Sequence, residues 1–251
     1  MMKKLGWVVA TLFMLVANFL AIYLPLAGVT TEQLSDKLST LITPAGFTFA
    51  IWSVIYILML VVTFLFVTNK ISLPKKAYNW YIISCLANGL WIVCWHYQNL
   101  HLSMIVILVL LFSLIMIDRS IRTQTTMPHY NLVRNSFLVY LWWVQIATLL
   151  MTTIYAIYQL NILSSTNIIF PIILIIIAGF INALVINKEK RIATSLVGIW
   201  ALRGIMSQTP IFGFADQIWT TSLIVGSLLL ILILGHLRRY KFNHTLNNTT
   251  I

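Results

Sequence analysis

Residues 43–56 read TPAGFTFAIWSVIY, and this stretch decides how the whole chain is interpreted. A Pro-Ala-Gly turn leads directly into an apolar run that is typical of a helix. In such a helix Phe49, Trp52 and Tyr56 share one face, because they are spaced at i, i+3 and i+7. Leucine or isoleucine would face lipid equally well, so the aligned rings make this face a candidate wall of a pocket.

The chain as a whole is strongly apolar. Its 251 residues are 60% hydrophobic and 8% charged, with a mean hydropathy of +0.94. A soluble domain carries about 25% charged residues, so the composition predicts an all-α, polytopic membrane bundle. Spans of about 20 apolar residues are expected at 7–27, 47–67, 78–97, 100–117, 136–158, 167–186, 192–208 and 217–235.

Basic residues alternate with these eight spans. If side one is the side of the N-terminus, 14 of the 16 Lys and Arg residues lie there, and the exceptions are Lys37 and Arg203. The positive-inside rule then predicts that both termini lie in the cytoplasm. The spans are expected in the plasma membrane. The net charge of +11 is therefore explained by basic residues in the connections on one side of the membrane. The lipid bilayer is the expected partner, and nucleic-acid binding is not expected.

Few polar side chains lie within the predicted spans. Arg203 suits binding of an anionic group, since its planar guanidinium matches a carboxylate. The alternative is a structural role, in which it extends to the outer interface or pairs with Asp216 or a backbone carbonyl. Because burial in hydrocarbon is costly, all such residues are functional candidates, and the set is Asn18, Asn88, Gln145, Asn182 and Arg203.

Two further helix faces combine aromatic and polar residues. Asn88, Trp91 and Trp95 are spaced at i, i+3 and i+7, and Tyr140 and Trp143 lie one turn apart on the fifth span. Deep indoles offer flat apolar area with one N–H donor, which suits a flat, conjugated or polycyclic ligand. The alternative is that Asn88 links helices by hydrogen bonds among ordinary aromatic packing.

No catalytic or metal-binding motif is present in the sequence. G-x-S-x-G, H-E-x-x-H, a phosphate-binding loop and C-x-x-C are all missing. His96 and His101 flank the short connection between the third and fourth spans, where interfacial side chains are the expected interpretation. The sequence therefore predicts a protein that is not an enzyme and that needs no cofactor.

These helix faces resemble the tryptophan-rich sensory protein family (TspO/MBR, translocator-protein-like), and most of all its longer bacterial members. The family's Pro-rich turn before an aromatic helix is similar to residues 44–56. Its Leu-Asn-x-x-Trp motif is similar to 87–91, and its Tyr-Leu-x-Trp-Val-x-x-Ala-Thr segment resembles 140–148. The longer members also resemble the chain at 18–25 and 200–202.

The resemblance covers residues 1–160 and implies a five-helix transmembrane bundle there. Residues 161–236 would be a three-helix transmembrane extension of unassigned purpose, and residues 237–251 a basic cytoplasmic tail. Family members bind porphyrins, haem and sterol-like molecules in a pocket below the loop that joins the first two helices. Dimers are common in the family, so a homodimer is one assembly that the resemblance implies.

The resemblance and the helix faces together give the predicted site. The family often has proline where this chain has Val139 and asparagine where it has Met151, so one polar wall group is missing. The resemblance implies ligand contacts at Trp52, Asn88, Trp91, Tyr140 and Trp143, and the helix faces add Tyr56, Trp95 and Arg203.

The leading hypothesis is a membrane binding or sensory protein for a flat hydrophobic ligand, tetrapyrrole- or sterol-like, with haem or porphyrin as candidate ligands. The alternative is a transporter of a small amphipathic or anionic solute. A third hypothesis, carried by the resemblance alone, is photochemical degradation of porphyrin by the indoles.

Overall fold

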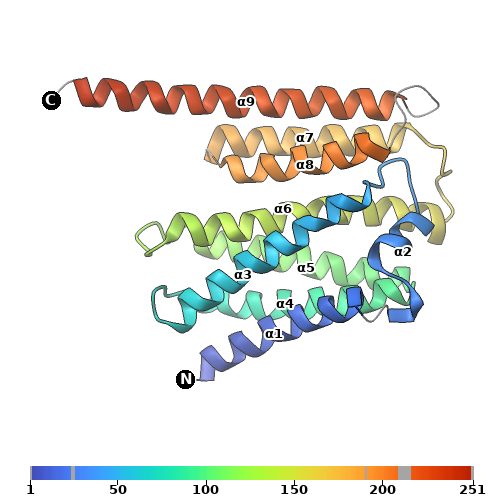
Figure 1. Cartoon of the computed structure of the whole chain (residues 1–251), viewed down its shortest axis with the longest axis horizontal. Coiled ribbons are helices and arrows are strands. Elements are labelled where there is room, and N and C mark those ends of the chain that lie inside the picture. Colours follow the sequence, from blue (N-terminus) through green and yellow to red (C-terminus); the bar gives the residue numbers. More distant parts are fainter. Residues whose placement is uncertain (1, 24–25, 190, 209–215, 250–251) are drawn as a thin grey trace.

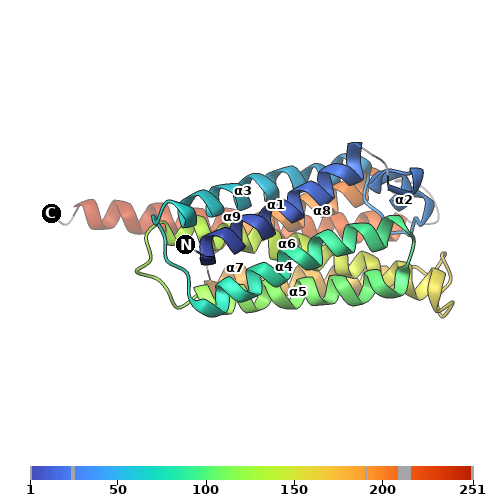
Figure 2. The same ribbon diagram turned by 90° about the horizontal axis from the view of Figure 1, so that it is seen from below.

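The computed structural model describes the backbone of residues 2–23, 26–189, 191–208 and 216–249 (Figure 1). All regular structure in these ranges is helical, and the long helices lie side by side in both views (Figures 1 and 2). The elements are α1 (Met2–Tyr23), η1 (Leu26–Gly28), α2 (Thr31–Lys37), η2 (Gly46–Ala50), α3 (Ile51–Val67), α4 (Lys75–His96), α5 (Leu100–Ile121), α6 (Tyr130–Ile154), η3 (Tyr155–Gln159), α7 (Ile169–Glu189), α8 (Ile192–Gln208) and α9 (Asp216–Thr249).

The predicted all-α membrane bundle is confirmed, and the chain is a multi-pass membrane protein. Six helical segments are long and apolar enough to cross a bilayer: α1, η2–α3, α5, α6–η3, α7 and α9. The other two predicted spans are α4 and α8. α4 packs between α1 and α5, and α8 packs against α6 and α9. Much of the surface of α4 and α8 therefore faces protein and tolerates more polar side chains.

The structure differs from the sequence expectation at three places: the end of the first span, the outer loop and the end of the last span. α1 ends at Tyr23 and does not continue as one helix to residue 27, because Ala27 has a φ of 55°, outside the right-handed helical region. The short helix α2 was not expected within the outer loop. Its start is set by a capping box in which Thr30 and Gln33 satisfy each other's backbone N–H groups.

The third difference is the end of α9, which continues past residue 235 to Thr249. Much of the predicted tail is therefore helical, and residues 250–251 lie outside the described ranges. The N-terminus and the α3–α4 and α5–α6 connections all lie at one end of the bundle (Figure 1). The basic residues that were counted on side one are concentrated in these segments.

Two groups of buried apolar side chains hold the bundle together. The larger group joins α1 to α6 and takes in Val197 and Ala201 of α8. The smaller group lies among α7, α8 and α9 and includes Ile42 from the outer loop. Figure 1 shows α7, α8 and α9 together on one side of α6. Leu150 of α6 packs against both groups.

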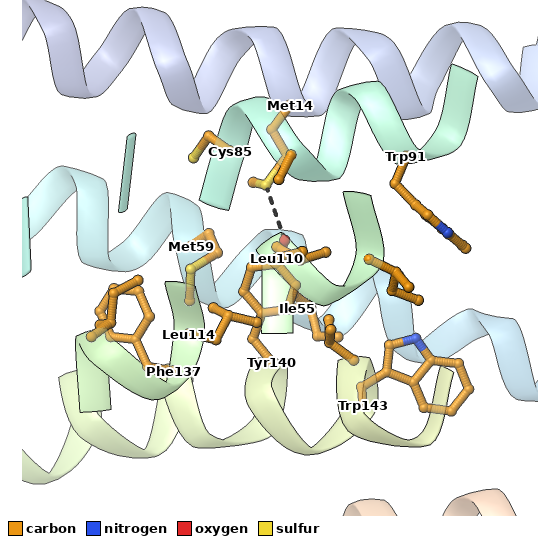
Figure 3. Close-up of a cluster of buried hydrophobic side chains, with 14 of the residues drawn as sticks. Met14, Ile55, Met59, Cys85, Trp91, Leu110, Leu114, Phe137, Tyr140 and Trp143 are labelled. Carbon is orange, nitrogen blue, oxygen red and sulfur yellow. Dashed lines mark hydrogen bonds between the residues drawn. The ribbon is translucent and has the colours of Figure 1, made fainter. Parts of the chain in front are cut away.

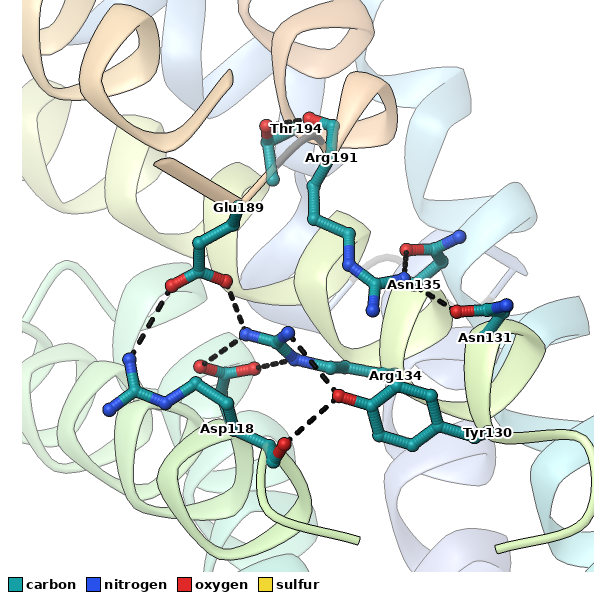
Figure 4. A network of polar contacts seen from close by, with 9 residues as sticks. Asp118, Tyr130, Asn131, Arg134, Asn135, Glu189, Arg191 and Thr194 are labelled. Atoms are coloured by element: carbon teal, nitrogen blue, oxygen red, sulfur yellow. Dashed lines mark hydrogen bonds and ion pairs between the residues drawn. The ribbon is translucent and has the colours of Figure 1, made fainter. Parts of the chain in front are cut away.

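An ion-pair network centred on the buried Arg134 joins α5, α6 and α7 near the basic end (Figure 4). The Arg134 side chain is only 5% exposed, and its Nε lies 2.8 Å from Oδ1 of Asp118. Its Nη2 donates to Glu189, which also lies 3.4 Å from Nη1 of Arg122. Because each buried charge is paired, the network connects the smaller helical group to the larger one without an isolated charge.

A second connection joins α8 to the Pro-Ala-Gly turn. Nε1 of Trp200 donates to the Thr48 carbonyl at 2.9 Å, and the Ala45 N–H donates to the Gly204 carbonyl at 3.1 Å. Gly204 allows this approach, since a Cβ there would overlap the Thr48 side chain. The start of α3 is therefore positioned by a helix more than 150 residues later in the chain.

We predict that Arg134→Met lowers the free energy of unfolding by about 3–5 kcal/mol, because Asp118 and Glu189 keep their charges and lose their central partner. Thermal unfolding in detergent measures the effect. Arg119→Met, at an exposed position on α5, is the control and should change the melting temperature little. Equal shifts in the two variants would show that the network does not stabilise the bundle.

Candidate functional site

Trp52 of α3 lies at the centre of an aromatic cluster. Its ring centroid is 5.7 Å from that of Tyr56, at an interplanar angle of 18°. The rings of Trp91 and Trp143 each lie 6.2 Å from it, and that of Tyr140 lies 6.1 Å away. The three helix faces that the sequence singled out therefore meet around one indole.

Trp95 and Phe49 extend the cluster at its two sides. Trp95 stacks on Trp91 one turn further along α4, at 6.2 Å and 16°. Phe49 meets the edge of Trp143 at 6.4 Å and 89°. Phe49 belongs to η2, whose position is set by α8, so this side of the cluster depends on the last three helices.

A chain of buried hydrogen bonds supports the cluster from behind. Asn18 of α1 donates to Oδ1 of Asn88 at 2.6 Å and to the Met14 carbonyl at 2.9 Å. Asn88 in turn donates to the Tyr140 hydroxyl at 2.8 Å. That hydroxyl donates to the Met14 sulfur (Figure 3). Asn88 is fully buried and joins α1, α4 and α6, which is the interhelical role the sequence left open.

The outer cavity is the larger of two cavities beside this cluster and lies between α1 and α3. Its volume is about 670 Å³. Its apolar rim is exposed on α1 at Val16, Phe19 and Tyr23, so it opens sideways from the bundle. The polar groups that face it are Asn18, Ser53, Tyr56, Thr30 and Thr31.

The inner cavity also borders Trp52 and is lined mainly by residues of α6, α7 and α8. Its volume is about 90 Å³, and its lining residues include Trp91, Trp95 and Trp143. Thr31, Phe49 and Trp52 line both cavities, so the two adjoin. Within the described residues, no charged side chain lines either cavity.

Several buried donors beside the cavities have no hydrogen-bond partner within the described part of the chain. They are Nε1 of Trp91, Trp95 and Trp143, and Oγ of Ser35, which line the inner cavity, and the Tyr56 hydroxyl, which belongs to the outer one. Each of these atoms is enclosed by surrounding side chains, and a buried donor without a partner costs free energy.

The structure brings together seven of the eight predicted site residues. Trp52, Tyr56, Trp91, Trp95 and Trp143 line a cavity, while Asn88 and Tyr140 stand behind the cavity walls. Ligand binding by these residues stays a prediction.

Arg203 lies apart from the other seven. It is exposed, it donates to Ser207 one turn later, and it forms no ion pair with any described residue. The pair with Asp216, one of the structural options for Arg203, does not form.

Sequence reasoning missed other residues of the site. Ser53 was passed over because its spacing does not match the aromatic face. Thr31 and the α7–α8 residues were passed over because nothing local links them to the tryptophans. His96, expected at the interface, is fully buried, with Nδ1 2.7 Å from the Ile92 carbonyl and Nε2 3.4 Å from the Thr31 hydroxyl.

We predict that Asn88→Ala lowers the free energy of unfolding by about 1–3 kcal/mol, since Asn18 and Tyr140 each lose a buried partner. Ligand affinity should change less than threefold, because Asn88 lines neither cavity. Thermal unfolding and ligand titration measure the two effects. A variant of unchanged stability with lost binding would instead make Asn88 a ligand contact.

Comparison with known proteins gives one match. No curated protein and no solved structure matches the chain. The family model described as "TSPO-like protein" matches residues 4–236, from α1 to the membrane-spanning part of α9. The match therefore continues past residue 160 and includes the last three helices, which the sequence resemblance had left outside the family core. With the family match extending over nearly the whole bundle, this chain belongs to the TSPO-like protein family.

Proposed function

We propose that this protein binds a flat, hydrophobic ligand, tetrapyrrole- or sterol-like, in the outer cavity between α1 and α3. The observation that carries the proposal is the volume of about 670 Å³ beside Trp52 and Tyr56. Pockets for small molecules hold about 300–1,000 Å³ and are mostly apolar with a few polar groups. The inner cavity, at about 90 Å³, is too small for a fused ring system.

The walls of the outer cavity support a flat ligand. Trp52 and Tyr56 are nearly parallel, and a ring system against them gains area and stacking together. Asn18 and Ser53 supply polar contacts. Haem or porphyrin is a candidate ligand, but no cation lines the cavity among the described residues. Ionised propionates would therefore stay at the mouth, near Thr30.

The exposed rim on α1 supports entry from the bilayer. Val16, Phe19 and Tyr23 are apolar or amphipathic and largely exposed, so a ligand dissolved in lipid would reach Trp52 without crossing water. We propose binding or sensing as the activity, without a catalytic step. Transport of a small amphipathic solute is the second candidate, supported by the shared wall between the two cavities.

We also propose that the protein lies in the plasma membrane with both termini in the cytoplasm, because basic residues gather at the end of the bundle that carries the N-terminus. The partner of the protein is then the surrounding lipid bilayer. A homodimer stays a prediction.

We predict that Ser53→Phe weakens protoporphyrin binding at least tenfold, because the new ring occupies the outer cavity. The control is Val54→Phe, one residue along the same helix, where the side chain is exposed and lines neither cavity. Porphyrin absorbance and emission, titrated in lipid nanodiscs, measure binding. A sterol probe titrated in parallel distinguishes the two ligand classes. If Ser53→Phe and Val54→Phe bind protoporphyrin with equal affinity, and also bind the sterol with equal affinity, the outer cavity is excluded as the binding site.

We predict that green fluorescent protein fused after residue 251 becomes fluorescent in the bacterial inner membrane, whereas a periplasmic alkaline phosphatase fused there stays inactive. The physical reason is the excess of Lys and Arg at that end. The reverse pattern would place the termini outside.

A further inference from the structure

We propose that the ligand carries a hydrogen-bond donor on its flat ring system, a hydroxyl or N–H group, and that Asn18 of α1 selects for it. The inference rests on the proposed function, because Asn18 lines the outer cavity. It adds the chemical class of the ligand: a neutral, flat molecule that donates a hydrogen bond to the cavity wall. It also assigns the residue that distinguishes such a molecule from an analogue without the donor.

Both amide hydrogens of Asn18 are used inside the protein. Its Nδ2 donates to the Met14 carbonyl at 2.9 Å and to Oδ1 of Asn88 at 2.6 Å. A carbonyl oxygen only accepts, so the contact with Met14 fixes which end of the Asn18 amide is the nitrogen. The oxygen is then the part of this amide that is left for an occupant of the cavity.

The Asn18 oxygen is available although the side chain is buried. Asn18 is 6% exposed and lines the outer cavity. No described residue donates to its Oδ1, and this atom is not enclosed, unlike the Tyr56 hydroxyl and the indole nitrogens of the cluster. Oδ1 therefore offers an acceptor with accessible surface at the wall of the cavity.

The hydrogen bonds behind Asn18 run in one direction. Asn18 donates to Asn88, Asn88 donates to the Tyr140 hydroxyl, and that hydroxyl donates to the Met14 sulfur (Figure 3). Successive hydrogen bonds polarise one another, so an amide that donates at its nitrogen becomes a better acceptor at its oxygen. Asn18 is the first residue of this chain, and a ligand that donates to it extends the chain by one bond.

A second wall group also has its donor directed into the protein. Nδ1 of His96 lies 2.7 Å from the Ile92 carbonyl, so a neutral His96 carries its proton there and its Nε2 accepts. The Thr31 hydroxyl, 3.4 Å from Nε2, then donates to His96 and keeps an oxygen lone pair free. Thr31 lines the outer cavity as well, so α1 and α2 each present an acceptor.

These acceptors decide which ligands are favoured. An ether or carbonyl oxygen placed against Asn18 would bring two acceptors together, and an acceptor left unpaired away from water costs free energy. A site built to pair a ligand hydroxyl rejects analogues without it more strongly than an apolar pocket does. Ser53 does not discriminate in this way, because a hydroxyl can donate or accept.

The test compares 1-pyrenemethanol with 1-(methoxymethyl)pyrene, which share the ring system and an acceptor oxygen and differ in the O–H donor. Quenching of tryptophan emission by energy transfer to pyrene, measured in nanodiscs, gives both dissociation constants. Partition of each probe into protein-free nanodiscs corrects the affinity ratio for the lipid.

Three variants are compared with the wild type. Asn18→Leu removes the acceptor, and Ser53→Ala removes the alternative partner for the ligand. Thr11→Val is the control on α1: it loses buried hydrogen bonds to Trp7 and Tyr81, and it lines neither cavity.

The corrected ratio should favour the alcohol by about tenfold in the wild type, in Thr11→Val and in Ser53→Ala, and it should fall to near one in Asn18→Leu. An equal ratio in Asn18→Leu and the wild type would overturn the assignment. So would a ratio near one in the unmodified protein, a measurement that depends on no variant. Loss of the preference in Ser53→Ala alone would assign the selection to Ser53 and remove it from Asn18.

Failure of the proposed function gives a different result. In that case neither probe would quench tryptophan emission beyond its partition into lipid, or quenching would be unaffected by Ser53→Phe. Binding of both probes that is lost in Ser53→Phe, combined with a ratio near one in the wild type, would retain the ring site and remove the donor preference alone.

Discussion

Helices in a bilayer have little hydrophobic reason to associate, since lipid tails are as apolar as leucine. Directional contacts must therefore select one arrangement. In this bundle the chain of hydrogen bonds through Asn88 serves that purpose: it joins α1 to α6 by way of α4, away from water. With Tyr140 fixed in this way, Trp52 packs against its ring, and both cavities take their shape from where Trp52 lies.

The last three helices are attached to this core at two places far apart along the bundle. Near the basic end, Arg134 lies between Asp118 and Glu189. At the other end, Trp200 and Gly204 of α8 bind the turn before α3. The inner cavity is lined by residues of α6, α7 and α8. The same helices position Phe49, so they affect the aromatic site through the backbone as well as through the cavity wall.

The helical segments were predictable because their signal is local. Long apolar runs with basic ends identify spans whatever their neighbours are, and the observed helices overlap all eight predicted ranges. The end of α1 and the short α2 were missed although Pro25 and the Thr30–Gln33 capping box were present in the sequence. Local signals of this kind are easily outweighed by hydropathy when the spans are assigned.

The sequence by itself determined the membrane bundle, the basic end and the aromatic faces around Trp52, Trp91 and Trp143, because spacing along a helix fixes which side chains share a face. Only the tertiary structure decided that Asn88 and Tyr140 support the walls, that Arg203 stands apart, and that α7 and α8 form one side of a cavity. These outcomes depend on which helix packs against which, and contacts between residues far apart in the chain leave no periodic trace in a single sequence.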